Sequence, residues 1–258
     1  MMDIIPVPAF SDNYIWLIHN ETGDHVAIID PGEATPVLRK LEEDNLKPVA
    51  ILVTHHHRDH INGIGALLEQ YPIPVFGPAN EQIRHRTHAL QEGDQVDLPE
   101  LDLTLYVCDV PGHTAGAIAY YGHDMLFSGD TLFTAGCGKL FEGTAAQMYS
   151  SLAKLAALPG ETLLYCGHEY TCNNLAFARA VEPGNVQISA RMDKVRRLRE
   201  QGLPTVPAPL KMEKETNPFL RTHQQTVIEA ASQFAGKPLA EGVEVLAAIR
   251  HWKDHFSS

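Results

Sequence analysis

The first two-thirds of the chain alternates short apolar runs with segments of helical periodicity. Apolar runs of strand length predict β-strands at 14–18, 26–30, 49–54, 103–110, 118–121, 125–130 and 162–167. Apolar residues at three- and four-residue spacing predict helices at 35–45 and 62–71, and a longer helix at 143–158 with Thr144 as a candidate N-cap. This mixture of strands and helices predicts an α/β fold in which helices cover sheets.

The pattern changes after about residue 169, where the strand signals stop. Helical periodicity predicts helices at 172–181, 189–201, 223–235 and 241–256, with a proline-rich connector at 202–210. We therefore expect two domains, a mixed α/β domain over residues 1–169 and a smaller helical domain over residues 170–258.

The stretch "THHHRDH" at 54–60 carries the densest set of candidate metal ligands. His55 and His57 are two residues apart, so in an extended segment they point to the same side, while His56 points away. Asp59 and His60 follow where the chain turns into the next helix. They cannot easily reach the same ion as His55 and His57. Two neighbouring ions explain this arrangement better than one.

Further candidate ligands stand directly after three of the predicted strands, as His55 does after its own. His113 follows the strand at 103–110, Asp130 ends the strand at 125–130, and His168 follows the strand at 162–167. Sites in α/β folds are built from loops at such strand ends. The predicted ligands are therefore His55, His57, Asp59, His60, His113, Asp130 and His168. Imidazole and carboxylate suit zinc, iron or manganese, and a set without thiolates indicates a catalytic site with open positions for water.

The net charge limits the kinds of partner that the chain can bind, and the cysteine content bears on where it is located. The 258 residues hold 20 Lys and Arg against 32 Asp and Glu, a net charge of −12, which disfavours binding to nucleic acid. A local basic spot could still attract a small anion, although a solvated helix face is the preferred interpretation of its residues, Arg191, Lys194, Arg196, Arg197 and Arg199. The four cysteines form no C-x-x-C pair, no apolar run is long enough to span a bilayer, and the N-terminus does not resemble a signal peptide. We expect a cytoplasmic protein that does not bind membranes.

These motifs resemble those of a known superfamily. "THHHRDH" matches the T-H-x-H-x-D-H signature of the metallo-β-lactamase superfamily, and "PGHT", "SGDT" and "CGHEY" match its later ligand motifs in order. Over essentially the whole chain the sequence is similar to the glyoxalase II (hydroxyacylglutathione hydrolase) family, on the stretches "IPVPAFSDNYIWLI", "IDPGEATPVL", "GDTLFTAGCGKLFEG", "GHEYT", "NPFLR" and "AIRHWKDHF". The resemblance implies an αββα metallo-β-lactamase-like sandwich with a C-terminal helical domain.

The resemblance also implies an activity, a thiolester hydrolase that converts S-D-lactoylglutathione to D-lactate and glutathione. One ion would take His55, His57 and His113, the other would take Asp59, His60 and His168, and Asp130 would bridge them. We expect two divalent ions per chain, zinc first and iron or manganese as alternatives. A metal-bound hydroxide would be the nucleophile, because water between two metals loses a proton near neutral pH. Asp59 would orient this nucleophile as well as bind metal.

The glutathione contacts follow from the same resemblance. They would be Lys139, Tyr170, Arg250 and Lys253, with Phe141 at the position where well-known eukaryotic members have a tyrosine. Glutathione carries two carboxylates, so a net acidic protein needs basic groups facing it locally. We expect a small-molecule thioester as the partner, and a monomer.

Five alternatives differ from this interpretation in identifiable features. The long helical tail and "GCGKLFEG" disfavour a β-lactamase, and the net charge disfavours a nuclease of the same superfamily. A flavin-linked di-iron electron-transfer protein usually has an acid where His57 stands. A persulfide dioxygenase binds one iron and need not keep the second metal site, and a non-enzymatic scaffold would not need all seven ligands. The metal used and the acyl-group preference stay open.

Overall fold

The computed structural model describes residues 2–20 and 23–256, which form two compact units. The first comprises the described residues up to Asp109 together with Thr114–Gly129, and the second comprises Val110–His113 and the described residues from Asp130 onward. The predicted domain boundary at residue 169 stays a prediction.

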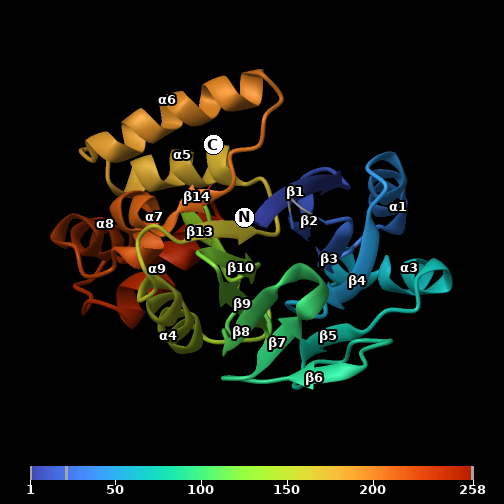
Figure 1. Cartoon of the computed structure of the whole chain (residues 1–258). Coiled ribbons are helices and arrows are strands. Elements are labelled where there is room, and N and C mark those ends of the chain that lie inside the picture. The colour runs from blue at the N-terminus through green and yellow to red at the C-terminus, as the bar shows by residue number, and fades with distance from the viewer. Residues whose placement is uncertain (1, 21–22, 257–258) are drawn as a thin grey trace. The chain divides into compact units, whose positions relative to one another are not determined.

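The first unit contains two sheets (Figure 1). In the first, β1 (Met2–Ala9), β2 (Asn13–Asn20) and β3 (His25–Ile29) are antiparallel, and β3, β4 (Lys47–Leu52), β5 (Val75–Pro78) and β6 (His88–Leu90) are parallel. The other contains an antiparallel run of β7 (Gln95–Leu98), β8 (Leu103–Asp109), β9 (Ile118–Gly122) and β10 (Met125–Gly129).

Two helices cover one face of the first sheet. Alternate residues of the parallel strands, such as Ile28 and Ile51, pack against Val37 of α1 (Ala34–Glu43) and Leu67 of α3 (Ile64–Gln70). The pairing of β3 with β4 runs in register from Ala27 to Ile29. Parallel strands end at one edge of a sheet, so the loops after β3 and β4 emerge together, and the short helix α2 (Arg58–Ile61) follows β4 there.

The second unit is mainly helical. Its strands are β11 (Leu132–Phe133), β12 (Gly136–Cys137), β13 (Leu163–Cys166) and β14 (Ala208–Pro209); its α-helices are α4 (Ala145–Ala156), α5 (Thr171–Val181), α6 (Val186–Glu200), α7 (Leu210–Thr216), α8 (Gln225–Ala235) and α9 (Val243–Asp254). Two 3-10 turns, η1 (Pro99–Leu101) in the first unit and η2 (Pro218–Leu220) in the second, complete the elements. Helices α5 and α6 lie side by side, as do α8 and α9 (Figure 1). None of the helices in the described part of the chain is long and apolar enough to span a membrane.

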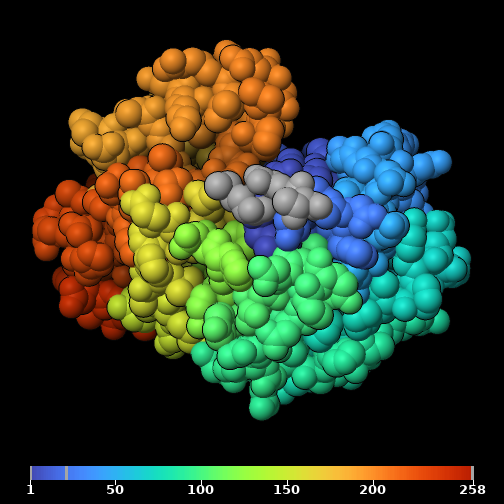
Figure 2. All heavy atoms as spheres, in the orientation of Figure 1, coloured from blue at the N-terminus to red at the C-terminus, as the bar shows by residue number. Residues whose placement is uncertain are grey.

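A buried ion pair anchors α6 within this unit. Arg191 donates to Glu213 at 2.5 Å and to the Thr216 hydroxyl at 2.6 Å, and Glu213 also accepts the backbone N–H of Ala135 at 2.6 Å. Arg191 is therefore separate from the exposed basic residues of α6. Lys194, Arg196 and Arg197 are exposed, whereas Arg191 is buried. Their helix, α6, belongs to the orange segment of Figure 2.

Candidate metal centre

The histidine-rich loop follows β4 in the first unit, and a carboxylate outside the predicted site orients two of its rings. Asp30, directly after β3, accepts the backbone N–H of Thr54 at 2.7 Å and the Thr54 hydroxyl at 2.6 Å. The same carboxylate lies 3.0 Å from Nδ1 of His60. Because a carboxylate only accepts, that nitrogen carries the proton, and Nε2 of His60 keeps its lone pair.

His55 has the same tautomer for a related reason. The hydroxyl proton of Thr54 is donated to Asp30, so the hydroxyl oxygen accepts from Nδ1 of His55, 3.0 Å away. Nε2 of His55 then carries the lone pair that a metal needs. The His55 and His57 ring centroids are 4.8 Å apart, whereas Nδ1 of His56 lies 3.0 Å from the Glu81 carboxylate.

Asp59 and His60 stand in the first turn of α2. Oδ2 of Asp59 lies 3.6 Å from Nε2 of His60 and accepts a hydrogen bond from Nδ2 of Asn13 at 3.0 Å. The loop after β3 approaches α2 closely, since a Cβ at Gly32 would lie only 1.8 Å from the backbone oxygen of Asp59. Glycine at position 32 therefore allows the two loops to meet.

The remaining predicted ligands lie together in the second unit. Oδ2 of Asp130 is 3.5 Å from Nε2 of His113 and 3.3 Å from Nε2 of His168, and all three residues are buried. Nδ1 of His113 donates to the backbone oxygen of Lys139 at 2.8 Å, so Nε2 of His113 is the nitrogen with the lone pair. A lone pair facing a carboxylate is repulsive, and a cation between them relieves that repulsion.

These distances suit metal ligation. Two donors on one tetrahedral ion, each about 2.0–2.2 Å from it, lie about 3.3–3.6 Å apart. The pairs His113–Asp130, His168–Asp130 and His60–Asp59 all fall in this range at 3.5, 3.3 and 3.6 Å. The His and Asp clusters of the chain are thus suited to binding two metal ions, with imidazole and carboxylate donors that fit zinc, iron or manganese.

Asp30 lies close enough to His55 and His60 to count as a ligand by distance alone. Its two oxygens already accept from Thr54 and His60, so we assign it the orienting role. The sequence holds a signal for this residue, because Asp30 directly follows an apolar strand as Asp130 does.

Three of the predicted substrate contacts lie close to His113 and His168. The Tyr170 ring stacks on the His168 ring, with centroids 4.7 Å apart and planes 6° apart. The Phe141 ring lies edge-on to the His113 ring at 5.3 Å, and the Lys139 ammonium lies 5.6 Å from the Phe141 centroid. Phe141 is 61% exposed and offers a flat apolar surface beside His113.

The other two predicted substrate contacts, Arg250 and Lys253, lie on α9 and differ in burial and in hydrogen-bond partners. Arg250 is buried, donates to the Cys137 carbonyl at 2.7 Å and pairs with Asp254 at 3.1 Å. Lys253 donates to the Asn173 carbonyl at 3.0 Å, and burial together with the nearby Arg250 charge lowers the pKa of Lys253 to about 8. Lys253 is half-buried, whereas Arg250 is buried.

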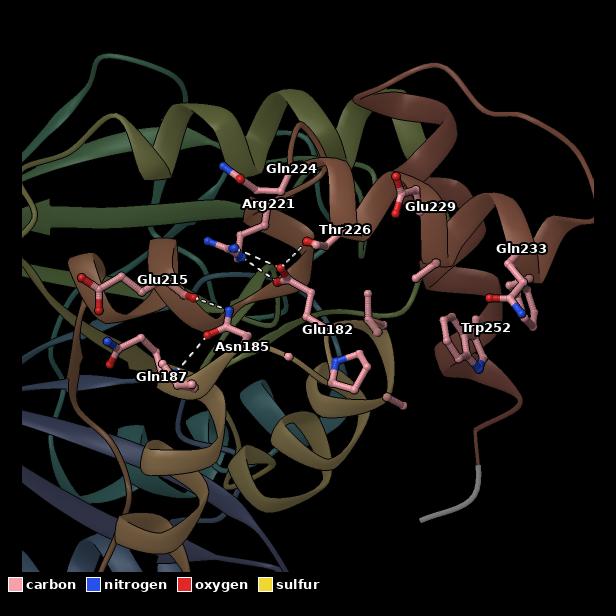
Figure 3. Close-up of a pocket in the computed structure, with 17 residues that line it drawn as sticks. Glu182, Asn185, Gln187, Glu215, Arg221, Gln224, Thr226, Glu229, Gln233 and Trp252 are labelled. Carbon is pink, nitrogen blue, oxygen red and sulfur yellow. Dashed lines mark hydrogen bonds and ion pairs between the residues drawn. The ribbon is translucent and has the colours of Figure 1, made fainter.

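A cavity of about 1000 Å³ lies elsewhere in the second unit, between the end of α5, the start of α6 and helix α8 (Figure 3). Glu182 and Arg221 pair inside it at 2.6 Å, and the stacked Phe234 and Trp252 rings line it. None of the predicted site residues lines this cavity.

Comparison with known proteins first defines the class. The sequence model of the metallo-beta-lactamase superfamily matches residues 10–168, which hold all seven predicted ligands. A Myxococcus xanthus structure described as ETHE1 has the same fold with a TM-score of 0.66 and 26% identity, covering 98% of each chain. The predicted α/β fold, with sheets and helices and a helical C-terminal part, is confirmed.

The particular family follows from the rest of the chain. The model described as hydroxyacylglutathione hydrolase C-terminus matches residues 169–256. Hydroxyacylglutathione hydrolases of Nitrosomonas eutropha and Nitrosomonas europaea are 54% and 53% identical to the chain, covering 99% of it and 100% and 97% of their own lengths. The chain belongs to the hydroxyacylglutathione hydrolase family, and the predicted family and hydrolase class are confirmed.

Proposed function

We propose that the chain hydrolyses S-D-lactoylglutathione to D-lactate and glutathione, using two divalent metal ions. The observation that carries the proposal is the Asp130 carboxylate, one oxygen of which lies 3.5 Å from His113 and 3.3 Å from His168. Full-length similarity to hydroxyacylglutathione hydrolases, including the helical C-terminal part, supports the substrate.

The proposed ligands are divided between the ions as the family resemblance implies. His55, His57 and His113 would hold one ion, Asp59, His60 and His168 the other, and Asp130 would bridge them. The Nδ1 hydrogen bonds of His55, His60 and His113 support this role, because each leaves the lone pair on Nε2. When bound, two such ions make water a strong nucleophile near neutral pH and polarise the thioester carbonyl.

Side chains of the protein would orient the attacking water and bind the substrate. Asp59, whose carboxylate is held by Asn13, would accept a hydrogen bond from the attacking water and fix its direction. The departing thiolate is a stable anion, so no strong acid is needed to protonate it as it leaves. Electrostatic interactions of catalytic groups are stronger where water is excluded. His113, Asp130 and His168 are all buried.

Basic groups of the second unit would hold the glutathione moiety. Lys139 and Lys253 are the proposed partners of its carboxylates, and the Tyr170 hydroxyl is a further donor. Arg250 is the third proposed basic contact, and its Nε–H has no hydrogen-bond partner among the described residues. Phe141 would contribute apolar contact only, because it lacks a hydroxyl.

The metal identity, the monomeric state and a cytoplasmic location belong to the same proposal. Zinc is the first candidate ion, and the chain would act as a monomer. All four cysteines are free, which fits a reducing compartment such as the cytoplasm.

The test is hydrolysis of S-D-lactoylglutathione by the purified chain, beside a glutathione-free thioester and a β-lactam. We expect kcat/KM to be highest for the glutathione thioester and β-lactam turnover to be at background. Equal rates with both thioesters, or a preference for the β-lactam, would contradict the proposal.

A further inference from the structure

A buried carboxylate that the proposed reaction does not use lies in the first unit. Glu81, in the loop after β5, is 7% exposed. Its Oε2 lies 3.0 Å from Nδ1 of His56. Its Oε1 accepts the backbone N–H of Gly116 at 3.2 Å and the hydroxyl hydrogen bond of Thr114.

The partners of Glu81 come from two of the ligand-bearing loops. His56 stands between the proposed ligands His55 and His57, and Thr114 directly follows His113. Burying a carboxylate is unfavourable unless hydrogen bonds replace its lost hydration. The hydrogen bonds of Glu81 therefore fix its side chain, and they also fix the positions of His56, Thr114 and the Gly116 backbone.

The fit between the loops is close. A Cβ at Gly116 would lie 2.7 Å from Cγ of Glu81 and 2.9 Å from the backbone oxygen of Asn80. Only glycine at position 116 lets its loop approach the Glu81 loop this far. Arg86 fixes the other side by donating to the Glu81 carbonyl at 2.8 Å, so the backbone of Glu81 is held as well as its side chain.

We propose that Glu81 is a positioning residue for the metal centre. It ties the His55–His60 loop to the Thr114–Gly116 loop, and so holds the neighbouring ligands in place before an ion binds. This inference rests on the proposed function, since it assigns the orientation of the same ligands. Glu81 does not touch substrate or metal; it acts through His56 and through the backbone next to His113.

The test compares two substitutions at Glu81 with a matched control. Glu81→Ala removes all three hydrogen bonds. Glu81→Gln keeps an acceptor for Thr114 and Gly116, and its amide can donate to His56 in the other tautomer. The control is Glu182→Gln, because Glu182 is also buried, at 4% exposure, and accepts from Arg221 and Thr226 in the cavity of Figure 3.

The measurements are the zinc dissociation constants, from competition with a chromophoric chelator, and the unfolding temperature of each metal-free protein. We expect Glu81→Ala to weaken zinc binding about 10–100-fold, the usual effect of losing a group that orients metal ligands. Glu81→Gln should recover most of this affinity. Glu182→Gln should lower the unfolding temperature while leaving zinc affinity within about twofold of the unsubstituted chain.

The outcomes separate the inference from the proposed function. Unchanged zinc affinity in folded Glu81→Ala and Glu81→Gln proteins would overturn the inference while the proposed function stands. An equal loss of zinc affinity in Glu81→Ala and Glu182→Gln would also overturn the inference, because the loss would then come from lower stability of the fold and not from the position of Glu81. If the unsubstituted chain binds no zinc, iron or manganese, the proposed function fails, and the role of Glu81 fails with it.

Discussion

The Asp30 carboxylate offers the sharpest test of how the first unit prepares its histidines. Asp30→Asn keeps the size of the side chain but replaces one acceptor oxygen by an amide that donates. The Asp30 oxygens receive three hydrogen bonds, two from Thr54 and one from His60. In either orientation of the new amide, at least one of these donors faces another donor.

The magnitude follows from these contacts. A hydrogen bond to a charged group contributes about 1.5–3 kcal/mol, and about 1.4 kcal/mol is a factor of ten in affinity. His60 can accept from the amide only by moving its proton to Nε2, which removes the lone pair that would bind metal. We therefore expect zinc affinity to fall about 10–100-fold, with a smaller change in the stability of the metal-free protein.

The assay is chelator competition for zinc, with Asp24→Asn as the control. Asp24 lies just before β3 where Asp30 lies just after it, and Asp24 pairs with Lys47 at a partly exposed position. Asp24→Asn should bind zinc as the unsubstituted chain does. Unchanged affinity in Asp30→Asn, or an equal loss in both variants, would refute this account of how the imidazoles are oriented.

Four further predictions address other parts of the chain. Asp130→Ala should lose metal and thioesterase activity together, because the proposed bridge contributes to both ions; elemental analysis that still finds two equivalents would contradict the bridge. Lys253→Ala should raise KM for S-D-lactoylglutathione about tenfold or more with little change in kcat, since the contact is remote from the reacting carbonyl. In the unsubstituted chain, KM should rise as pH increases through about 8, because the pKa of Lys253 is lowered to about 8 and the ammonium loses its charge above it; a KM that is flat from pH 7 to about 9 would exclude Lys253 from carboxylate binding. Glu213→Ala should lower the free energy of unfolding by about 3–5 kcal/mol in urea titration, because it leaves Arg191 buried without its partner; a change below about 1 kcal/mol would show that this pair is not needed for folding.

Elements with strong local signals were predictable from sequence. The predicted cap at Thr144 is confirmed: its hydroxyl accepts the Gln147 N–H at 3.2 Å, and the Gln147 side chain accepts the Thr144 N–H at 2.9 Å. The predicted strands lie within about two residues of the observed ones, because buried strands read as uninterrupted apolar runs. Helical periodicity located α5, α6, α8 and α9 in the same way.

Elements that depend on distant partners were missed. Strand β1 contains Pro6 and Pro8, which weaken a strand signal, but it lies at the edge of its sheet, where proline is tolerated. Glu81 had no motif of its own, since its side-chain partners lie 25 to 35 residues away along the chain. Arg250 was predicted only as a substrate contact, and its hydrogen bond to the Cys137 carbonyl, 113 residues away, could not be inferred from helical spacing.

The central claim is that this chain is a thioesterase that requires two metal ions. The most direct measurement is titration of the metal-free chain with zinc while the rate of S-D-lactoylglutathione hydrolysis is followed. We expect the rate to rise until about two equivalents are bound and then to stay constant. A rate that is maximal at one equivalent, or no hydrolysis at any zinc content, would contradict the claim.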